Sequence, residues 1–380
     1  MPARADVVVI GLGAMGSCAA MALARRGQRV IGFDRYHPPH QFGSSHGRSR
    51  IIREAYYESP AYVPLVRRAW EQWRAMERDA GRPLLRQTGG LMLGTEASGL
   101  IRGALQSAKT HQISIEMLGS AEVRRRFPAL APPAGSVGVL EPNAGILDPE
   151  ACVESALHLA AAAGAVCRFD TKVLGWRDCG RGLEVNTSSG SVTCGRVVCS
   201  VGSWVGELVP ASLLPATVER QVFAWFEPTT GGELLLPGRL PVFLWEHQPN
   251  RIVYGFPDDG AGFKAAIHHE GDLVSDPADL DWVVRGADLD RLTGVLATLV
   301  PAGWGRVREA RVCPYTDTPD RHFVIGEHPQ DPRVLLVSPC SGHGFKFATA
   351  VGEMVADLAV GGRLPPELAL FAPSRFGSPA

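Results

Sequence analysis

The sequence of 380 residues has no long apolar run and no strong excess of charge of either sign. No stretch reaches the length that a transmembrane helix needs, so no membrane anchor of that kind is expected. A formal net charge of −1 gives no electrostatic reason to expect binding to nucleic acid or to an anionic membrane. With 45% hydrophobic and 20% charged residues, the composition is that of an ordinary soluble globular protein.

Targeting signals and metal-binding patterns are also missing. The N-terminus enters an apolar strand at once, which leaves no room for a signal peptide, and the last residues are no peroxisomal address. The eight cysteines form neither a C-x-x-C pair nor a zinc spacing, so no metal site is expected. We therefore expect a cytoplasmic protein in which most cysteines, such as Cys18, Cys152 and Cys199, are buried thiols.

What is present begins with a strand, a glycine-rich turn, a helix and a second strand. Residues 6–10 are apolar and β-branched, as in a buried parallel strand. They lead into the turn 11–16, Gly-Leu-Gly-Ala-Met-Gly, and then into helix formers over 19–26. A second strand, 29–33, ends at Asp34. This order, with G-x-G-x-x-G between strand and helix, predicts binding of an adenine dinucleotide.

Each part of this motif has a physical reason. Gly11 permits the tight turn, Gly13 lets backbone N–H groups approach a pyrophosphate, and Gly16 lets the helix pack close to the sheet. The helix N-terminus adds partial positive charge, and Asp34 can accept hydrogen bonds from ribose hydroxyls. The motif itself does not separate NAD from FAD. Asp34 would repel the 2′-phosphate of NADP, so we interpret the neighbouring Arg35 as a surface residue.

The segment 43–53 is rich in glycine, serine and arginine. It makes a poor helix and a poor strand, and the plainest interpretation is a solvated loop. Two apolar residues between Arg50 and Arg53 argue against full exposure. Guanidinium groups held near a cofactor would neutralise phosphate or a negative charge that develops on a ring.

Further along the chain, α/β patterns alternate with a different, aromatic-rich pattern. Lys264 and His268 are four residues apart, so in a strand they would share a face. The sequence predicts helices over 60–80, 122–126, 149–164, 276–299 and 347–359. It predicts strands at 91–93, 166–169, 172–174, 183–185, 192–194, 196–200, 221–226, 242–245, 251–256, 262–269, 310–315 and 334–338.

A second glycine turn, at 342–346, again precedes a helix. Two such turns at opposite ends of the chain suit a long cofactor: one can hold the pyrophosphate and the other can face a redox ring. This favours FAD over NAD. We expect an α/β protein with a Rossmann-like FAD-binding domain and a mostly antiparallel β-sheet substrate domain. The first comprises residues 1–85, 145–212 and 316–372, and the second comprises 86–144 and 213–315.

Five motifs carry a resemblance to a known family. They are the turn at 11–16, the segment 43–53, Tyr-Gly-Phe-Pro at 254–257, Cys-Pro-Tyr-Thr at 313–316 and Ser-Gly-His-Gly-Phe-Lys-Phe at 341–347. With them the chain resembles the monomeric sarcosine oxidase and N-methyltryptophan oxidase family, flavoproteins of the D-amino-acid-oxidase-like superfamily. The resemblance extends from Val7 to Gly362.

The resemblance implies roles for several residues. The family cysteine that matches Cys313 is bonded through sulfur to the 8-methyl carbon of the flavin, which implies covalent FAD here. The matches to Arg53 and Lys346 hold the substrate carboxylate, a sensible clamp of a bidentate fork and a point charge. The match to Lys264 promotes the reaction of reduced flavin with oxygen, where a cation would stabilise the charge that forms.

Further matches complete the expected site. Arg50 and His46 match residues that line the flavin, and His268 and Tyr254 match residues around the substrate amine. We expect Lys264, His268, Arg50 and Tyr254 to act in catalysis, and Arg53, Lys346, Tyr254, Trp245 and Tyr315 to bind substrate. The expected FAD contacts are Gly11, Gly13, Ala14, Met15, Gly16, Asp34, Arg35, Ser44, His46, Arg50, Val173, Gly202, Trp204, Cys313, Gly342, Gly344, Phe345 and Lys346.

Departures from the family pattern leave the substrate open. Trp245 stands where sarcosine-oxidising members carry a smaller methionine near the substrate, and Pro314 stands where a methionine is usual. His269 has no family match and is interpreted as a surface residue.

The resemblance implies oxidation of sarcosine by oxygen to glycine, formaldehyde and hydrogen peroxide, in a monomer without protein partners. Alternatives are a larger N-methyl amino acid such as N-methyltryptophan, or a cyclic one such as pipecolate or proline. An NAD-dependent dehydrogenase and a flavin-binding protein without turnover are the alternatives from other classes.

Overall fold

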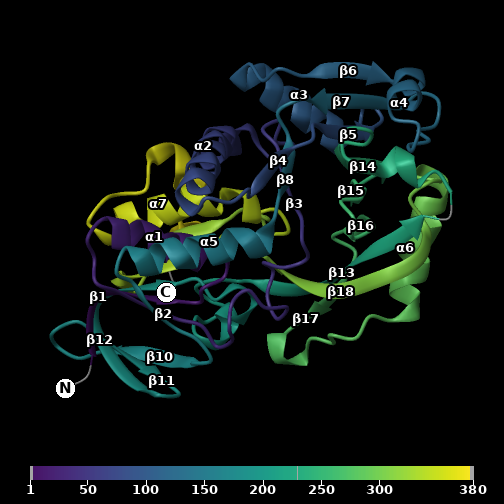
Figure 1. Ribbon diagram of the computed structural model, residues 1–380. Helices are drawn as coiled ribbons and strands as arrows, with labels where there is room; N and C mark the ends of the chain where they lie inside the picture. Colours follow the sequence, from purple (N-terminus) through teal and green to yellow (C-terminus); the bar gives the residue numbers. More distant parts are fainter. Residues whose placement is uncertain (1–2, 229, 377–380) are drawn as a thin grey trace.

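The computed structural model describes residues 3–228 and 230–376. Two large sheets and the helices around them form the molecule, and the long strands β13 (Thr217–Pro228) and β18 (Gly305–Asp317) extend from one part towards the other (Figure 1). The mixed α/β class agrees with the prediction. The limits of the two predicted domains remain a prediction. No helix among the described residues is long and apolar enough to cross a membrane.

Within these residues, eight strands form the first sheet, in the order β10-β11-β12-β1-β2-β9, with β20 beside β12 and β19 beside β20. β1 pairs in parallel with β2 and with β12. One edge of β12 is shared, because its first half pairs with β11 in antiparallel fashion and its last residues pair in parallel with β20. The strands are β1 (Ala3–Ile10), β2 (Val30–Phe33), β9 (Val166–Arg168), β10 (Val173–Asp178), β11 (Leu183–Thr187), β12 (Gly190–Cys199), β19 (Val324–His328) and β20 (Asp331–Ser338).

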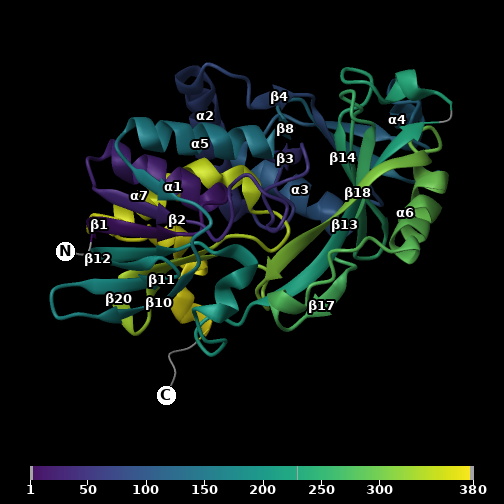
Figure 2. The same ribbon diagram turned by 60° about the horizontal axis from the view of Figure 1, so that its bottom comes forward.

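Helices cover one face of this sheet (Figures 1 and 2). They are α1 (Ala14–Arg25), α2 (Val63–Ala80), α5 (Pro149–Ala162) and α7 (Ala348–Ala359). Residues of β1 alternate between the two faces, so that Val7 and Val9 pack against the helices while Val8 and Ile10 join a second buried cluster. α1 and α7 approach closely because α7 has Gly352 at the contact, where a Cβ would meet the backbone of Cys18 at 2.6 Å.

The second sheet has nine strands in the described part of the chain, in the order β17-β13-β16-β15-β14-β5-β7-β6, with β18 on the other edge of β13. All its pairings are antiparallel except that of β14 with β5. Its remaining strands are β5 (Gly90–Gly94), β6 (Glu116–Gly119), β7 (Val137–Glu141), β14 (Val242–Gln248), β15 (Arg251–Phe256), β16 (Phe263–His268) and β17 (Asp272–Val274). The helices α3 (Gly99–His111), α4 (Ser120–Arg126) and α6 (Gly286–Leu299) belong to this part of the molecule.

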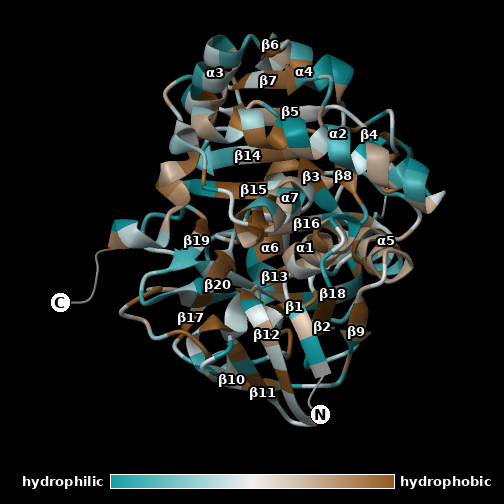
Figure 3. Cartoon of the chain, turned by 90° about the vertical axis from the view of Figure 1, so that its left-hand side faces the viewer, coloured by the Kyte–Doolittle hydropathy of each residue, from teal (hydrophilic) through white to brown (hydrophobic). Residues whose placement is uncertain are grey.

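A small sheet, β3-β8-β4, holds segments near the cavity described below. Its strands are β3 (Arg50–Ile52), β4 (Leu85–Gln87) and β8 (Gly145–Leu147). Several short 3-10 helices complete the described chain: η1 (Pro60–Tyr62), η2 (Gly202–Glu207), η3 (Gly232–Leu235), η4 (Pro277–Asp279), η5 (Phe345–Phe347), η6 (Pro366–Phe371) and η7 (Pro373–Phe376). Strand interiors are mainly hydrophobic and the outer turns of several helices are hydrophilic (Figure 3).

Two predictions about loops and strands need correction, and one helix was missed. The segment 43–53 is irregular only as far as β3, whose backbone pairs with β8. The hairpin strand at 192–194 and the parallel strand at 196–200 belong to the single strand β12. Helix α3 was not predicted at all.

The helix expected over 276–299 begins only at Gly286. Arg220 explains the late start, because its guanidinium binds the carbonyl oxygens of Asp281 at 2.7 Å and Val283 at 2.5 Å. Those carbonyls are therefore engaged by a side chain in an irregular segment. The helix begins where Asp288 accepts a hydrogen bond from the N–H of Arg285.

Candidate active site

A cavity of about 1880 Å³, counted with its opening to solvent, extends from the turn after β1 to the inner strands of the second sheet. Its wall includes Gly11 and Asp34 at one end and Lys264 and Cys313 at the other. A long, mostly apolar cavity with a few converging polar groups is the usual form of a cofactor site.

The first glycine turn is closed towards the protein and open towards the cavity. Gly11 has a φ of 83°, and a Cβ there would meet the carbonyl oxygen of Ser200 at 2.5 Å. A Cβ on Gly16 would meet the carbonyl oxygen of Gly11 at 1.7 Å, so only glycine lets α1 start this close to β1. Gly13 has only the Ser45 hydroxyl near its free side, at 3.4 Å. Backbone N–H groups at the start of α1 can therefore approach a phosphate.

Asp34 stands at the end of β2 and lines the same cavity. Its carboxylate accepts hydrogen bonds from the N–H groups of Leu12, at 2.7 Å, and Tyr36, at 2.9 Å. The acid therefore also fixes the glycine turn. Because a carboxylate can accept about four hydrogen bonds, it keeps capacity for ribose hydroxyls.

Arg35 was interpreted as a surface residue and also counted among the expected FAD contacts, and the structure places it in the cavity wall. Its guanidinium lies 4.1 Å from the ring centroid of Trp204, and it pairs with Glu207 at 2.7 Å. Val173 and Gly202 line the cavity at the same end. The glycine turn, the acid and these walls fit an adenine dinucleotide.

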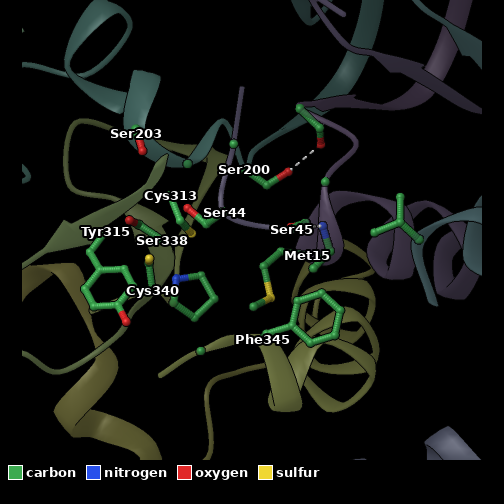
Figure 4. Close-up of a pocket in the computed structure, with 18 of the residues that line it drawn as sticks. Met15, Ser44, Ser45, Ser200, Ser203, Cys313, Tyr315, Ser338, Cys340 and Phe345 are labelled. Carbon is green, nitrogen blue, oxygen red and sulfur yellow. Dashed lines mark hydrogen bonds between the residues drawn. The ribbon is translucent and has the colours of Figure 1, made fainter. Parts of the chain in front are cut away.

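The second glycine turn forms another part of the wall. Gly342 has a φ of 73°, and a Cβ there would meet the rings of Tyr315 and His268 at 2.7 and 2.9 Å. A Cβ on Gly344 would meet the carbonyl oxygen of Pro339 at 1.6 Å. Phe345 and Met15 lie next to each other on one side of the pocket, and Cys313, Ser44 and Tyr315 lie on the other side (Figure 4).

Cys313 lines the cavity beside a cation. Arg50 directs Nη2 at the Cys313 sulfur, 3.6 Å away, and also donates to the carbonyl oxygen of Ser44 at 2.8 Å. Burial raises the pKa of the Cys313 thiol, although the cations of Arg50 and Lys264 oppose this. These cations would stabilise a thiolate, which is the reactive form of a cysteine.

Lys264 is fully buried in this wall, and its Nζ donates three hydrogen bonds. The acceptors are the carbonyl oxygens of Gly47 and Ser49, at 2.6 and 3.1 Å, and the Ser49 hydroxyl, at 3.1 Å. Burial, and then the Arg50 cation, hold the pKa of Lys264 well below its ordinary value. His268 is on the same face of β16 and also lines the cavity, as the spacing predicted.

Arg53 lines the cavity as part of an ion pair that the sequence did not reveal. Its Nη2 lies 2.8 and 2.7 Å from the two carboxylate oxygens of Glu58, which is also in the wall. Although burial opposes ionisation, Arg53 keeps the pKa of Glu58 below its ordinary value. Glu141 holds the intervening loop by accepting from the N–H groups of Glu54 and Ala55 at 2.7 and 2.8 Å.

Lys346 lies close to this pair. Its Nζ donates to the carbonyl oxygen of His343 at 2.6 Å and to the Tyr56 hydroxyl at 3.3 Å. Burial, and then the Arg53 cation, lower the pKa of Lys346 to about 7. The two cations and one carboxylate leave a net positive charge when Lys346 is protonated, which suits an anionic group of a substrate.

Tyr254, His268 and Tyr315 complete this end of the cavity. His268 Nδ1 lies 3.3 Å from the Tyr315 hydroxyl. Burial, and then the neighbouring His269, hold the pKa of His268 well below its ordinary value, so His268 is neutral at physiological pH. A neutral imidazole and two hydroxyls can accept or donate hydrogen bonds without adding charge.

Three expected site residues do not line the cavity. Trp245 is 2% exposed and packs in the second hydrophobic cluster, because neighbouring residues of β14 face opposite ways and Leu244 takes the cavity side. His46 is buried against Phe223, with a ring-centroid distance of 5.5 Å, and neither of its ring nitrogens has a hydrogen-bond partner among the described residues. Gly16 does not reach the cavity; its role is to let α1 start close to β1.

His269 is not at the surface either. It lies between the carboxylates of Glu219 and Asp317, behind His268. The residue has a φ of 57°, so the chain leaves the extended conformation there and turns the side chain inward. Strand alternation could not reveal this position.

Among the wall residues that were not predicted are Tyr57, Glu58, Leu244 and Phe256. Leu244 and Phe256 could have been found from alternation on their strands, since Phe256 is two residues from Tyr254. Tyr57 and Glu58 lie on a loop, and no periodic signal marks them.

Comparisons with known proteins agree with this geometry. The profile of the family described as "FAD dependent oxidoreductase" matches residues 6–358. A monomeric sarcosine oxidase of Streptomyces avermitilis is 40% identical over 98% of both chains. An N-methyl-L-tryptophan oxidase of Yersinia pestis is 35% identical over 98% of this chain and 99% of its own.

A solved structure of NikD, described as an unusual amino acid oxidase essential for nikkomycin biosynthesis, superposes with a TM-score of 0.85. It shares 24% sequence identity over 98% of both chains, so it supports the fold alone. The family match confirms FAD, which the second glycine turn already favoured over NAD. The chain is an FAD-dependent oxidoreductase and belongs to the family of the monomeric sarcosine oxidases and N-methyltryptophan oxidases.

Proposed function

We propose that this protein oxidises a secondary amino acid, with sarcosine as the substrate, and that oxygen is the electron acceptor. Sarcosine, oxygen and water then yield glycine, formaldehyde and hydrogen peroxide. The observation that carries the proposal is the single cavity that joins a dinucleotide turn to a pair of cations, Arg53 and Lys346, beside Cys313 and Lys264. The names of the relatives point to N-methyl amino acids as the substrate class.

Bound FAD supplies the ring that accepts two electrons from the amine and passes them to oxygen. Arg53 and Lys346 hold the substrate carboxylate in this proposal, and Arg53 exchanges part of its pairing with Glu58 for it. Tyr254, Tyr315 and His268 surround the amine and exclude water. Holding the amine in one orientation contributes to the rate because the reacting atoms start close together.

The remaining roles are proposals of the same kind. Lys264 places a buried cation where oxygen is reduced, and such a charge lowers the barrier to forming a negatively charged species. Cys313, which Arg50 contacts, is the proposed point of covalent attachment of FAD. Gly11, Gly13, Ala14, Met15, Asp34 and Ser44 hold the dinucleotide part of FAD.

The wall around the amine supports a small substrate. Leu244, Tyr254, Phe256 and Tyr57 are the large side chains that we place there. The bulky Trp245 lies outside this wall, which removes one of the two departures, Trp245 and Pro314, that left the substrate open. A larger N-methyl amino acid or a cyclic one is the second candidate, because a relative is named for N-methyl-L-tryptophan.

Two measurements on the purified protein test the proposal. Acid precipitation should leave the yellow colour in the pellet. A peroxide assay should give its highest kcat/KM with sarcosine among sarcosine, N-methylalanine, N-methyltryptophan, proline and pipecolate. A yellow protein that forms no peroxide from any of these amines would contradict an oxidase and leave a flavin-binding protein.

A further inference from the structure

Behind the amine end of the cavity, His269 joins two carboxylates that belong to different strands. Its Nδ1 lies 3.0 Å from Oε2 of Glu219 on β13 and 3.3 Å from Oδ2 of Asp317 on β18. All three side chains are largely buried, with 9%, 6% and 12% of their area exposed. Two buried carboxylates that accept from one histidine nitrogen stabilise the charged form of the ring and fix its position.

The local backbone brings this imidazole against the wall of the cavity. With a φ of 57°, His269 ends the extended course of β16, and its ring lies against that of His268, tilted by 55° at a centroid distance of 4.1 Å. The Tyr315 ring is 5.2 Å away. Glu219 is the register partner of Tyr315 and Asp317 is two residues further along β18, so both carboxylates lie on the Tyr315 face of the sheet. The His269 ring is the member of the group that contacts the His268 ring.

Hydrogen bonds within the protein occupy both carboxylate oxygens of Glu219. Its Oε1 accepts from Nε2 of Gln221 at 2.6 Å and from the N–H of Gly271 at 2.7 Å. Gly271 can come this close because it has no Cβ, which would meet the carbonyl oxygen of Arg220 at 1.9 Å. Both Glu219 oxygens are therefore engaged by protein donors, whereas Oδ1 of Asp317 has no hydrogen-bond partner among the described residues. We interpret the group as a hydrogen-bonded ion cluster, and the mass spectrometry for metals described below tests the alternative of a metal site.

Burial alone would disfavour the imidazolium, but hydrogen bonds to Asp317 and Glu219 leave the pKa of His269 raised. Arg321 is the cation that opposes this, and His268 and Tyr315 are the other titratable groups against the ring. Burial raises the pKa of Asp317, and the hydrogen bond to His269 helps keep that of Glu219 low against burial.

We propose that His269, held between Glu219 and Asp317, is a positioning residue for amine oxidation: a fixed cation behind His268 and Tyr315 that keeps His268 neutral and favours the unprotonated substrate amine. This rests on the proposed function. An amine gives up electrons only when its nitrogen lone pair is free, so a cation behind the amine site increases the reactive fraction at a given pH.

The other charged groups around the cavity do not replace this effect. Arg53 and Lys346 are assigned to the carboxylate, and Glu58 partly neutralises Arg53. Arg50 and Lys264 lie beside Cys313. His269 is the group in direct ring contact with the neutral His268 near the amine.

The variant His269→Asn tests the charge with little change in shape. An asparagine amide N–H can take the place of Nδ1–H between the carboxylates, and asparagine tolerates the left-handed backbone. His328→Asn is the matched control, because His328 is on β19 and accepts a hydrogen bond from the N–H of Gln330 outside the cavity. The measurement is the anaerobic rate of flavin reduction by sarcosine as a function of pH.

For His269→Asn we expect the rise of the rate with pH to move upward by about one pH unit, as for the loss of one charge roughly 10 Å from the amine. The rate at high pH should approach that of the unaltered protein, and His328→Asn should match the unaltered protein throughout. An unshifted profile in His269→Asn, with normal flavin content, would overturn the inference alone. An unaltered protein whose flavin no secondary amine reduces would overturn the proposed function instead.

Two further measurements test the charge of His269 and the nature of the group independently of the enzyme's rate. Nitrogen-15 NMR of histidine-labelled holoenzyme should show one imidazolium that persists above pH 7 and is missing in His269→Asn. A resonance that titrates near 6.5 would contradict the inference. Mass spectrometry for metals should find no stoichiometric ion lost on the substitution; such an ion would make the group a metal site and overturn the inference.

Discussion

Nη2 of Arg53 lies 2.8 and 2.7 Å from the two carboxylate oxygens of Glu58 in the wall of the cavity. The cation that we assign to the substrate carboxylate therefore already has an anionic partner from the protein. A bound carboxylate must compete with Glu58 for Arg53, and this competition sets the affinity for small acids.

Glu58→Gln should bind small carboxylates such as acetate about tenfold more tightly, which corresponds to about 1.4 kcal/mol, because Arg53 loses its internal competitor. It should also lower the melting temperature, since one partner of a buried ion pair is removed. Titration of the flavin absorption with acetate measures the affinity. Glu54→Gln removes the same charge from a pair with Arg67 and should change little. Weaker binding in Glu58→Gln would contradict the competition.

Lys346 should make carboxylate binding depend on pH. Burial and the Arg53 cation lower its pKa to about 7, so it is charged below this pH and loses its proton above it. The dissociation constant of acetate should therefore rise as the pH increases through about 7. Lys346→Met should remove this dependence, whereas the exposed Lys109→Met should retain it. A pH-independent constant in the unaltered protein would show that Lys346 stays charged or takes no part.

Leu244 and Trp245 should behave in opposite ways although they are neighbours. Leu244→Ala enlarges the cavity and should raise kcat/KM for N-methyltryptophan relative to sarcosine about tenfold. Trp245→Ala should leave this ratio unchanged and cost about 3–5 kcal/mol of unfolding free energy, because it empties part of the second core. Denaturant unfolding and peroxide assays measure both. If only Trp245→Ala changed the ratio of the two kcat/KM values, this would contradict the placement of Trp245 outside the substrate pocket.

Cys313 and Cys340 both line the cavity, which offers a matched pair for the attachment of FAD. Cys313→Ser should release the yellow colour into the supernatant after acid precipitation, since a hydroxyl is a far weaker nucleophile than a thiolate. Cys340→Ser should keep the colour in the pellet. The reverse result would place the attachment on Cys340.

Lys264→Met should slow the reaction of reduced flavin with oxygen about 100-fold, while flavin reduction by the amine changes much less. Stopped-flow absorption measures the two half-reactions separately. Lys172→Met, which removes a cavity-lining lysine that pairs with Glu207, is the control. Equal losses in both half-reactions would contradict a role in oxygen reduction.

The dinucleotide end could be predicted because its signal is local. Gly11, Gly13, Gly16 and Asp34 fall within one strand–helix–strand unit, and their spacing is set by the geometry of that unit. The same reasoning placed Lys264 and His268 on one face of β16. Where the conformation was regular, residue periodicity was enough.

The predictions of site residues failed where the conformation of a single residue determines which side chain lines the cavity. A step of one position along β14 exchanges Leu244 for Trp245 and turns the side chain to the opposite face. The left-handed backbone of His269 breaks strand alternation, so a residue that looked exposed is buried. The pairing of Arg53 with Glu58 depends on a loop that Glu141 holds from a distant strand, and no local pattern encodes it.

The two turns that line the cavity come from opposite ends of the chain. Residues 11–16 leave the ribosome long before β20 and the turn 342–346. A nascent chain therefore cannot enclose its cofactor until this second turn has been made. Flavin incorporation should follow synthesis of the second turn, and chains truncated before residue 331 should accumulate without colour.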